Sequence, residues 1–200
     1  MKKVYDGNRI KHLNKNPIMK LFIRNFNREV LRLASLCRPN KILDAGCGEG
    51  FTTVEIGKRF PNAKINAFDI DAEKIVYAKN NKQLKNISYA TGDIFDIKFK
   101  KDSFDLVVCN EVLEHVKDYR SALSNIMKVS RRFVIISVPN EPWFRFACIL
   151  RLKYLSNFGN HPAHVNNWTK GQFKELLRGY GKILRVRTSG VWNIILLEKY

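Results

Sequence analysis

The sequence predicts an α/β protein built on a doubly wound, mostly parallel sheet of seven strands, the last of which is antiparallel. Three observations predict this. From residue 42 onward, short apolar segments alternate with amphipathic segments of helical period, as in a parallel sheet with helices on both faces. A glycine-rich turn follows the first apolar segment. Only a short turn, Thr188 to Gly190, links the last two strands, and so short a link requires an antiparallel pair.

Residues 1–41 are expected to form a basic arm and then an amphipathic helix from Pro17 to about Cys37. Such a helix either packs on its own domain or lies on a membrane surface. Its predicted apolar face is Leu21, Phe22, Phe26, Val30 and Leu33. A basic stripe recurs at four-residue spacing: Lys20, Arg24, Arg28 and Arg32.

The segment from Ile42 to Gly50 is the one around which the other elements are placed. An apolar strand runs into Asp44 and then into alternate glycines, Gly46, Gly48 and Gly50. Alternate glycines allow a sharp turn and let a ligand approach the main chain, and a helix that starts there offers free backbone N–H groups. The turn therefore predicts a nucleotide-type site. The helix after it is expected to bury Phe51, Val54 and Phe60.

The next elements continue the alternation. Strands are predicted at Ala63–Phe68, Ile87–Ala90, Phe104–Cys109 and Phe133–Val138. Asp71 is placed to cap a helix that begins at Ala72, and Asp105 is expected to be a solvated strand start, so neither is assigned to the site. A helix before the fifth strand is expected to bury Val116, Tyr119, Leu123, Ile126 and Met127.

Residues 140–168 break this rhythm with interleaved aromatic and basic side chains, which indicates an insertion. A capping box of Thr169 and Gln172 then begins the last helix. Two strands, Ile183–Arg187 and Trp192–Glu198, close the chain. We therefore divide it into residues 1–41 and one domain, residues 42–200, that carries the insertion. The face of the last helix is predicted to be Phe173, Leu176, Leu177 and Tyr180.

The net charge of +18 lies almost entirely outside the predicted core. Residues 42–140 carry 15 Lys and Arg against 13 Asp and Glu, whereas residues 1–41 carry 11 against 2 and residues 141–187 carry 9 against 2. A lysine-rich composition alone would have loaded the middle as well. We expect the flanks to meet an anionic partner, which is a phosphate-bearing substrate, a membrane surface or nucleic acid.

The cysteines and apolar segments indicate a cytoplasmic protein. The basic flanks extend this expectation to peripheral contact with an anionic membrane. No run of about 18 apolar residues predicts a transmembrane helix, and no apolar segment follows Met1 to resemble a secretory signal. Widely spaced cysteines without a C-x-x-C pair are most simply reduced thiols. They are Cys37, Cys47, Cys109 and Cys148.

Three carboxylates follow successive predicted strands. Asp44 ends the first strand, Asp69 follows the second, 23 residues after Gly46, and Asp93 follows the third. Asp69 is placed to accept hydrogen bonds from the hydroxyls of a ribose, and Asp93 is placed to accept one from an exocyclic amine of a base. Together the three acids would repel the pyrophosphate of a dinucleotide. The glycine spacing G-x-G-x-G also differs from the dinucleotide pattern, so the site favours a cationic nucleoside.

The chain resembles the class I S-adenosylmethionine-dependent methyltransferases, of the broad type that includes the quinone-biosynthesis methyltransferases. The matching segments are residues 42–50, Ala67–Ile70, Gly92–Ile94 and Phe104–His115. The resemblance implies S-adenosylmethionine as cofactor and S-adenosylhomocysteine as product. It implies that Ile70 packs on adenine and that Asn110 lies beside the sulfonium. The full set of cofactor-binding residues that we expect is Asp44, Gly46, Cys47, Gly48, Asp69, Ile70, Gly92, Asp93, Ile94 and Asn110.

Histidines mark the acceptor side. His115 follows the fourth strand, where it is either a general base that takes the acceptor proton or a structural histidine at a helix start. His161 and His164 have ligand-like spacing, but no third His, Cys or acid accompanies them in the sequence, so we predict no metal site. The alternative for this pair is contact with the acceptor.

The implied reaction is direct displacement, in which an acceptor oxygen, nitrogen or carbon attacks the methyl group in line with the sulfur. Aromatic and cationic side chains in the flanks suggest a small or lipid-like, anionic acceptor. RNA is the alternative acceptor, because the aromatic residues of the insertion can stack on bases. A third hypothesis is that the chain is a non-catalytic, cofactor-binding subunit of a complex. A dehydrogenase is a weaker hypothesis.

Overall fold

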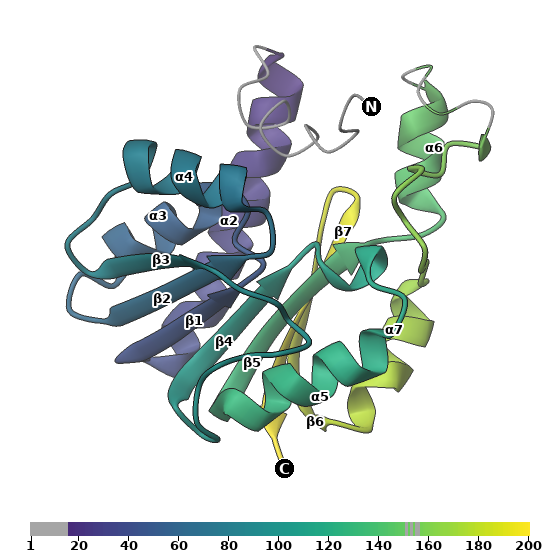
Figure 1. Ribbon diagram of the computed structural model, residues 1–200. Coiled ribbons are helices and arrows are strands. Elements are labelled where there is room, and N and C mark those ends of the chain that lie inside the picture. Colours follow the sequence, from purple (N-terminus) through teal and green to yellow (C-terminus); the bar gives the residue numbers. More distant parts are fainter. Residues whose placement is uncertain (1–15, 151, 153, 155–156) are drawn as a thin grey trace.

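The structure, a computed structural model, describes residues 16–150, 152, 154 and 157–200 (Figure 1). These residues form a seven-stranded sheet with the strand order β3-β2-β1-β4-β5-β7-β6. Strands β1 to β5 pair in parallel, and β7 runs antiparallel to both β5 and β6. The predicted fold class is confirmed. The basic arm before Asn16, and Arg151 and Lys153 of the insertion, lie outside the described residues.

The strands are β1 (Lys41–Ala45), β2 (Lys64–Asp69), β3 (Ile87–Thr91), β4 (Phe104–Asn110), β5 (Ser130–Pro139), β6 (Gly181–Ser189) and β7 (Trp192–Lys199). The helices are α2 (Pro17–Cys37), α3 (Phe51–Arg59), α4 (Ala72–Asn81), α5 (Tyr119–Val129), α6 (Trp143–Leu150) and α7 (Lys170–Arg178), and a 3-10 turn, η1, spans Leu113–His115. The predicted strands differ from these only by a few residues at their ends.

Helices cover both faces of the sheet, α5 and α7 on one and α2, α3 and α4 on the other (Figure 1). Strand β5 shows why its sequence is almost purely apolar. Ile135 packs with α2 residues on one face, whereas Val134 and Ile136 pack with α5 and α7 residues on the other. A strand buried on both sides cannot alternate apolar and polar residues.

Helix α2 packs on its own domain, against β4 to β7 and α3. Its capping residue is Asn16, whose Oδ1 accepts from the backbone N–H of Ile18 at 2.9 Å. The predicted apolar face is wrong at its start, because Leu21 and Phe22 are exposed and Ile23 is buried instead. The buried side chains of α2 are Ile23, Phe26, Val30, Leu33 and Ala34, and the last four of these pack in the core with the sheet.

Three other local predictions need correction. Helix α3 buries Thr53, Ile56 and Gly57, whereas Phe51, Val54 and Phe60 are only half-buried. Val116 precedes α5 rather than lying on it, although it still packs against the α5 core. Asp105 is not simply solvated: its Oδ2 accepts from the backbone N–H groups of Asn40 and Lys41 at 3.0 and 2.9 Å. This carboxylate ties the start of β4 to the start of β1.

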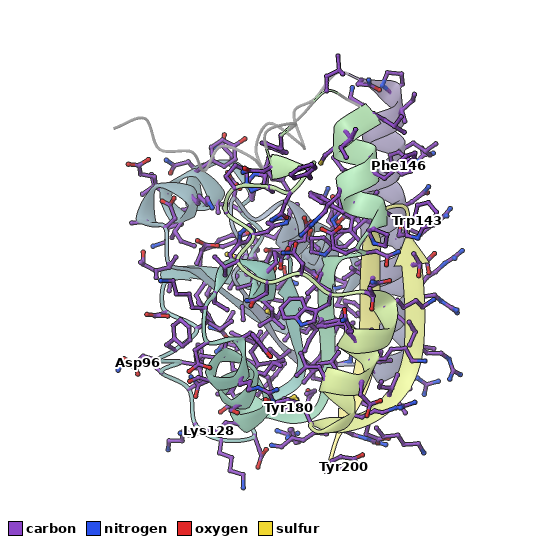
Figure 2. All side chains as sticks on the ribbon, turned by 90° about the vertical axis from the view of Figure 1, so that its right-hand side faces the viewer. Asp96, Lys128, Trp143, Phe146, Tyr180 and Tyr200 are labelled. Carbon is purple, nitrogen blue, oxygen red and sulfur yellow. The ribbon has the colours of Figure 1, made fainter. Side chains whose placement is uncertain are left out.

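The insertion contains helix α6, which rises from the carboxyl end of β5 beyond the sheet (Figure 1). Trp143 and Phe146 project from α6 and are 60% and 54% exposed (Figure 2). The confirmed capping box of Thr169 and Gln172 then starts α7. Among the described helices, none has both the length and the apolar character that crossing a membrane requires.

Candidate active site

Hydrogen bonds join the carboxyl ends of neighbouring strands into one edge. The backbone N–H groups of Gly46 and Cys47 both donate to the carbonyl of Phe68, at 2.8 and 2.9 Å. The N–H of Gly92 donates to the carbonyl of Asp69 at 3.0 Å, which joins the ends of β2 and β3. The sequence segments that carry the predicted site residues therefore meet at one edge of the sheet, as expected for parallel strands.

The glycine turn after β1 depends on two of its glycines for both conformation and space. Gly46 and Gly50 have φ angles of 82° and 76°, in the left-handed region that disfavours other residues. A Cβ on Gly46 would collide with the side chain of Val112, and one on Gly50 would lie 2.8 Å from the Tyr89 hydroxyl oxygen. The main chain therefore passes as close to its neighbours as a glycine allows.

Buried carboxylates lie around the turn. The hydroxyl of Thr53 donates to Asp44 Oδ2 at 2.6 Å, and the N–H of Gly48 donates to Asp69 Oδ2 at 2.8 Å. Burial raises the pKa of Asp44 to about 6, the Thr53 hydrogen bond opposes this rise, and the charge of Asp69 adds to it. Glu49 is also buried, and its Oε2 has no hydrogen-bond partner among the described residues.

These acids give the turn a negative potential, and the thiol of Cys47 reports it. Burial raises the pKa of Cys47 well above its usual value, and the charges of Asp44, Asp69 and Glu49 add to the effect. The thiol therefore stays protonated and neutral. A ligand that carries positive charge would relieve the repulsion between these carboxylates, whereas a phosphate would meet it.

The predicted adenine-side residues occupy different environments. Ile70 is 71% exposed directly after Asp69, so its apolar side chain is open to a ligand. Ile94 is buried in the core beneath α5. Asp93 is half-buried, and its Oδ1 accepts from the backbone N–H of Phe95 at 2.9 Å. Of these three side chains, Ile70 therefore offers the largest open apolar surface.

At the end of β4, the side-chain amide of Asn110 uses its oxygen in a hydrogen bond within the protein but not its nitrogen. Its Oδ1 accepts from the hydroxyl of Ser137 on β5 at 2.9 Å. Its Nδ2 is buried and has no hydrogen-bond partner among the described residues. A buried donor without a partner costs roughly 1–3 kcal/mol, so this amide favours a ligand that carries an acceptor.

The end of the insertion is fastened to η1, the turn that follows β4. His115 Nδ1 lies 3.0 Å from the carbonyl oxygen of Ala163, and Val165 N–H donates to the carbonyl of Glu114 at 2.8 Å. Asn166 Nδ2 donates to the carbonyls of Leu113 and Val116, at 3.0 and 2.6 Å. The predicted acceptor side is thus built from two segments about 50 residues apart in the sequence.

This arrangement overturns the premise on which no metal site was predicted. The rings of His161 and His164 lie 4.9 Å apart, and the ring of His115 lies 5.0 Å from that of His164. Glu114 is adjacent, with a carboxylate oxygen that falls within 4.8 Å of ligand nitrogens of both His115 and His164. A third histidine and an acid therefore do accompany the pair, because the insertion folds back onto η1.

Sequence reasoning missed four residues that the structure brings to this edge: Glu49, Thr53, Glu114 and His164 as a cluster partner of His115. Glu49 and Thr53 flank the glycine turn, and their proximity to Asp44 was visible in the sequence. Glu114 precedes His115 and was within the matching fourth segment. The partnership with His164 had no local signal, because it depends on the path of the insertion.

A basic groove lies beside this edge rather than on it. It has a volume of about 1050 Å³ and runs between α2, α3 and the end of α4, starting near Phe51. The predicted basic stripe of α2 lines it, so the stripe faces a groove and not the sheet. The cationic lining residues are Lys20, Arg24, Arg28, Arg32, Lys58, Arg59 and Lys82.

Comparisons with known proteins identify the family of the chain. A family model described as a methyltransferase domain matches residues 38–176. A malonyl-[acyl-carrier protein] O-methyltransferase of Bacillus cereus is 27% identical over 88 residues, which are 44% of this chain and 32% of that protein. A release factor glutamine methyltransferase of Flavobacterium psychrophilum is 25% identical over 157 residues, 76% of this chain and 55% of that protein. The chain thus spans between about a third and about half of these relatives.

Among solved structures, the fold is similar to that of magnesium protoporphyrin IX methyltransferase from Synechocystis PCC 6803, crystallised with S-adenosylhomocysteine. The TM-score is 0.76 at 17% identity, over 96% of this chain and 92% of that one. At this identity the likeness concerns the fold alone.

Proposed function

The chain belongs to the methyltransferase-domain family of class I S-adenosylmethionine-dependent enzymes, and from this premise we propose that it methylates a small or lipid-like acceptor that carries negative charge. The observation that carries the cofactor part is the set of buried carboxylates around a glycine turn. Asp44, Glu49 and Asp69 suit a ligand with a sulfonium and an ammonium group, and they disfavour a pyrophosphate.

Each predicted cofactor residue has a role in this proposal. Gly46, Cys47 and Gly48 line the methionine part with main chain, and Asp44 adds charge beneath it. Asp69 binds the ribose hydroxyls with the lone pairs that its contacts with the backbone leave. Ile70 packs on the adenine ring, and Gly92, Asp93 and Ile94 border the ring edge. Asn110 donates its Nδ2 to the ligand beside the sulfonium.

When bound, the cofactor supplies an electrophilic methyl group on a good leaving group. The chain then has to align the acceptor, exclude water and remove a proton where the acceptor carries one. His115 is the proposed base. A carbonyl oxygen can only accept, so Nδ1 of His115 carries the hydrogen toward Ala163, and Nε2 keeps its lone pair.

The acceptor part rests on α6 and the basic flanks. Trp143 and Phe146 expose large apolar surfaces, and their ring centroids lie 6.4 Å apart. Arg145 lies between them in the sequence but pairs with the buried Glu141 at 3.6 Å, so the cations for an anionic head come from the basic flanks. An exposed aromatic pair next to basic flanks suits an amphiphile with an anionic head, presented by a membrane or free in solution. We therefore propose peripheral contact of this helix with anionic lipid.

Methyl transfer from labelled S-adenosylmethionine by the purified chain tests the proposal. Extracted lipids, anionic metabolites and RNA would be offered separately, and we expect label in the lipid or metabolite fraction. Retention by anionic vesicles at low salt should fall at least about fivefold in the double variant Trp143→Ser/Phe146→Ser. Val76→Ser, an equally exposed change on α4, should leave retention unchanged. Label only in RNA, or equal retention of both variants, would contradict the lipid-like acceptor.

RNA is the second candidate acceptor, favoured by the basic groove. Seven Lys and Arg side chains line it, with Glu55 as the acid among the lining residues. Binding through several phosphates would weaken steeply with salt, by a slope of roughly 0.7 per neutralised phosphate on a logarithmic plot for a single strand. A steep slope that Arg24→Glu and Arg28→Glu reduce, together with label in RNA, would favour this acceptor over a lipid.

A further inference from the structure

A cluster of imidazoles lies where the chain between α6 and α7 crosses η1. The ring centroids of His115 and His164 are 5.0 Å apart, and that of His161 lies 4.9 Å from His164 and 6.3 Å from His115. Phe144 and Tyr154 pack against His164 and His161 at 5.1 and 4.9 Å. Two of the three imidazole rings are therefore packed against an aromatic neighbour as well as against each other.

A buried carboxylate completes a donor set. Glu114 is 1% exposed, and one ligand atom from each of Glu114, His115 and His164 lies within 4.8 Å of the others. Ligands of a tetrahedral Zn²⁺ ion, each about 2.0–2.2 Å from the metal, are roughly 3.3 Å apart. Closing the three groups onto one ion therefore needs shifts of at most about 1.5 Å, which side-chain rotation supplies.

The backbone around the cluster orients its members. His115 donates from Nδ1 to the carbonyl of Ala163, which leaves Nε2 as the atom with a lone pair. A ligating histidine usually donates its second ring nitrogen to a carbonyl or carboxylate in this way. The backbone N–H groups of Val165 and Asn166 both donate to the carbonyl of Glu114, which fixes His164 beside the η1 turn.

We propose that Glu114, His115 and His164 bind a divalent transition-metal ion, with Zn²⁺ as the first candidate. Two imidazoles and one carboxylate suit Zn²⁺ or another first-row ion better than Mg²⁺, which prefers oxygen ligands and water. Three protein ligands leave a coordination position open, and the ion lies on the acceptor side, next to the end of β4. The open position takes an oxygen of the acceptor.

The ion then gives His115 a different role from that of a free base. An acceptor hydroxyl bound to the metal has a lowered pKa and passes its proton to solvent water. The resulting oxygen then forms a bond to the methyl carbon as the bond from that carbon to sulfur breaks, so the ion both positions and activates the acceptor. This acceptor role rests on the proposed function, whereas ion binding itself does not. The two parts can therefore be tested separately.

The experiment measures binding of ZnCl₂ to the purified full chain by calorimetry, with MgCl₂ as the comparison, and records the absorption of the Co²⁺ form. We expect one Zn²⁺ per chain and weak or no Mg²⁺ binding. The Co²⁺ form should show a d–d spectrum without thiolate charge transfer, which excludes the cysteines as ligands. Zinc that does not bind, or a thiolate spectrum, would overturn the proposal.

Variants then identify the ligands. His164→Ala and the near-isosteric Glu114→Gln should each weaken Zn²⁺ binding at least about 100-fold, because each removes one of three protein ligands. His161→Gln is the matched control, because His161 belongs to the same ring cluster but lies outside the donor set. This substitution should change the zinc affinity by less than about threefold. Equal zinc affinity in wild type and His164→Ala would contradict the proposed site.

S-adenosylmethionine binding, measured in the same samples, separates this proposal from the proposed function. We expect every variant to keep its cofactor affinity within about threefold, because the cluster lies on the acceptor side. If the wild-type chain bound zinc but not the cofactor, the metal site would be supported and the methyltransferase proposal would be contradicted. If it bound the cofactor but not zinc, the metal site would be contradicted and the methyltransferase proposal would be unaffected. Circular dichroism of each variant establishes that it is folded.

Discussion

The glycine-turn edge of the sheet and the proposed acceptor side, where the insertion meets η1, are built by contacts that differ in their separation along the sequence. At the glycine turn, Thr53 bonds to Asp44 nine residues away, and Gly48 bonds to Asp69 21 residues away. On the acceptor side, His115 and Ala163 are 48 residues apart, and Leu113 and Asn166 are 53 residues apart. The first region is a property of one strand-turn-helix unit and its neighbour, whereas the second exists only once the insertion has folded back.

This difference predicts that the two regions can be damaged separately. Changes at the glycine turn should remove cofactor binding together with stability, because the turn is also part of the core. Changes where the insertion meets η1 should affect the acceptor and leave the cofactor in place.

The largest effect is expected from Gly46→Val. Its φ of 82° and its contact with Val112 leave no room for a branched side chain. We expect a loss of about 3 kcal/mol or more in the free energy of unfolding, from strain and overpacking together, and no measurable cofactor binding. Chemical denaturation and calorimetry check both. Gly171→Ala, where a Cβ meets nothing closer than 4.0 Å, is the control and should be neutral or stabilising.

The next effect tests the ribose assignment. Asp69→Ala should weaken S-adenosylmethionine binding at least about 100-fold, since it removes charge-assisted hydrogen bonds to two hydroxyls and also releases Gly48. Asp71→Ala is matched in chemistry and lies two residues away. It loses only the N-cap of α4, worth about 1 kcal/mol of stability, and should bind the cofactor normally. Equal losses in the two variants would mean that Asp69 only terminates its strand.

On the proposed acceptor side, Asn166→Ala removes the side-chain hydrogen bonds to Leu113 in η1 and to Val116 directly after it. The carbonyls of Leu113 and Val116 lose a donor, at a cost of about 1–3 kcal/mol in the anchoring of the insertion. We expect kcat/KM for the acceptor to fall by roughly tenfold while the cofactor affinity stays within threefold. A parallel loss of cofactor affinity would show that the two regions are coupled. Calorimetry and single-turnover kinetics on one preparation distinguish these results.

The same contrast explains what could be predicted from the sequence. The order of elements and the sheet came from periodicity, and the glycine turn came from residues whose chemistry is local. The buried face of α2 includes Ile23 in place of Leu21 and Phe22, because Ile23 faces the neighbouring helices α3 and α4, whose positions the helical period of α2 does not specify. The cluster of His115, His161 and His164 was out of reach, because no spacing rule connects a residue in η1 with one in the returning insertion.

The smallest effect concerns pH and has opposite signs in two measurements. With a pKa of about 6, Asp44 is protonated below that pH in the free protein, and a cationic cofactor prefers its ionised form. Affinity should therefore fall as the pH falls, by about fourfold from pH 7 to about 5.5.

The effect on folding stability has the opposite sign. In the unfolded chain the same group has its usual pKa near 3.8, so between about pH 4 and 6 the folded protein holds the extra proton. Its contribution to folding stability is thus present at low pH and is lost as the pH rises through 6.

The control is Asp44→Asn, which should bind the cofactor more weakly at pH 7. Neither its cofactor affinity nor its folding stability should show the pH dependence of Asp44. If wild type and this variant gave parallel profiles in both calorimetry and denaturation, the cofactor charge would not be balanced by Asp44, and the negative potential of the turn would have to come from Asp69 and Glu49.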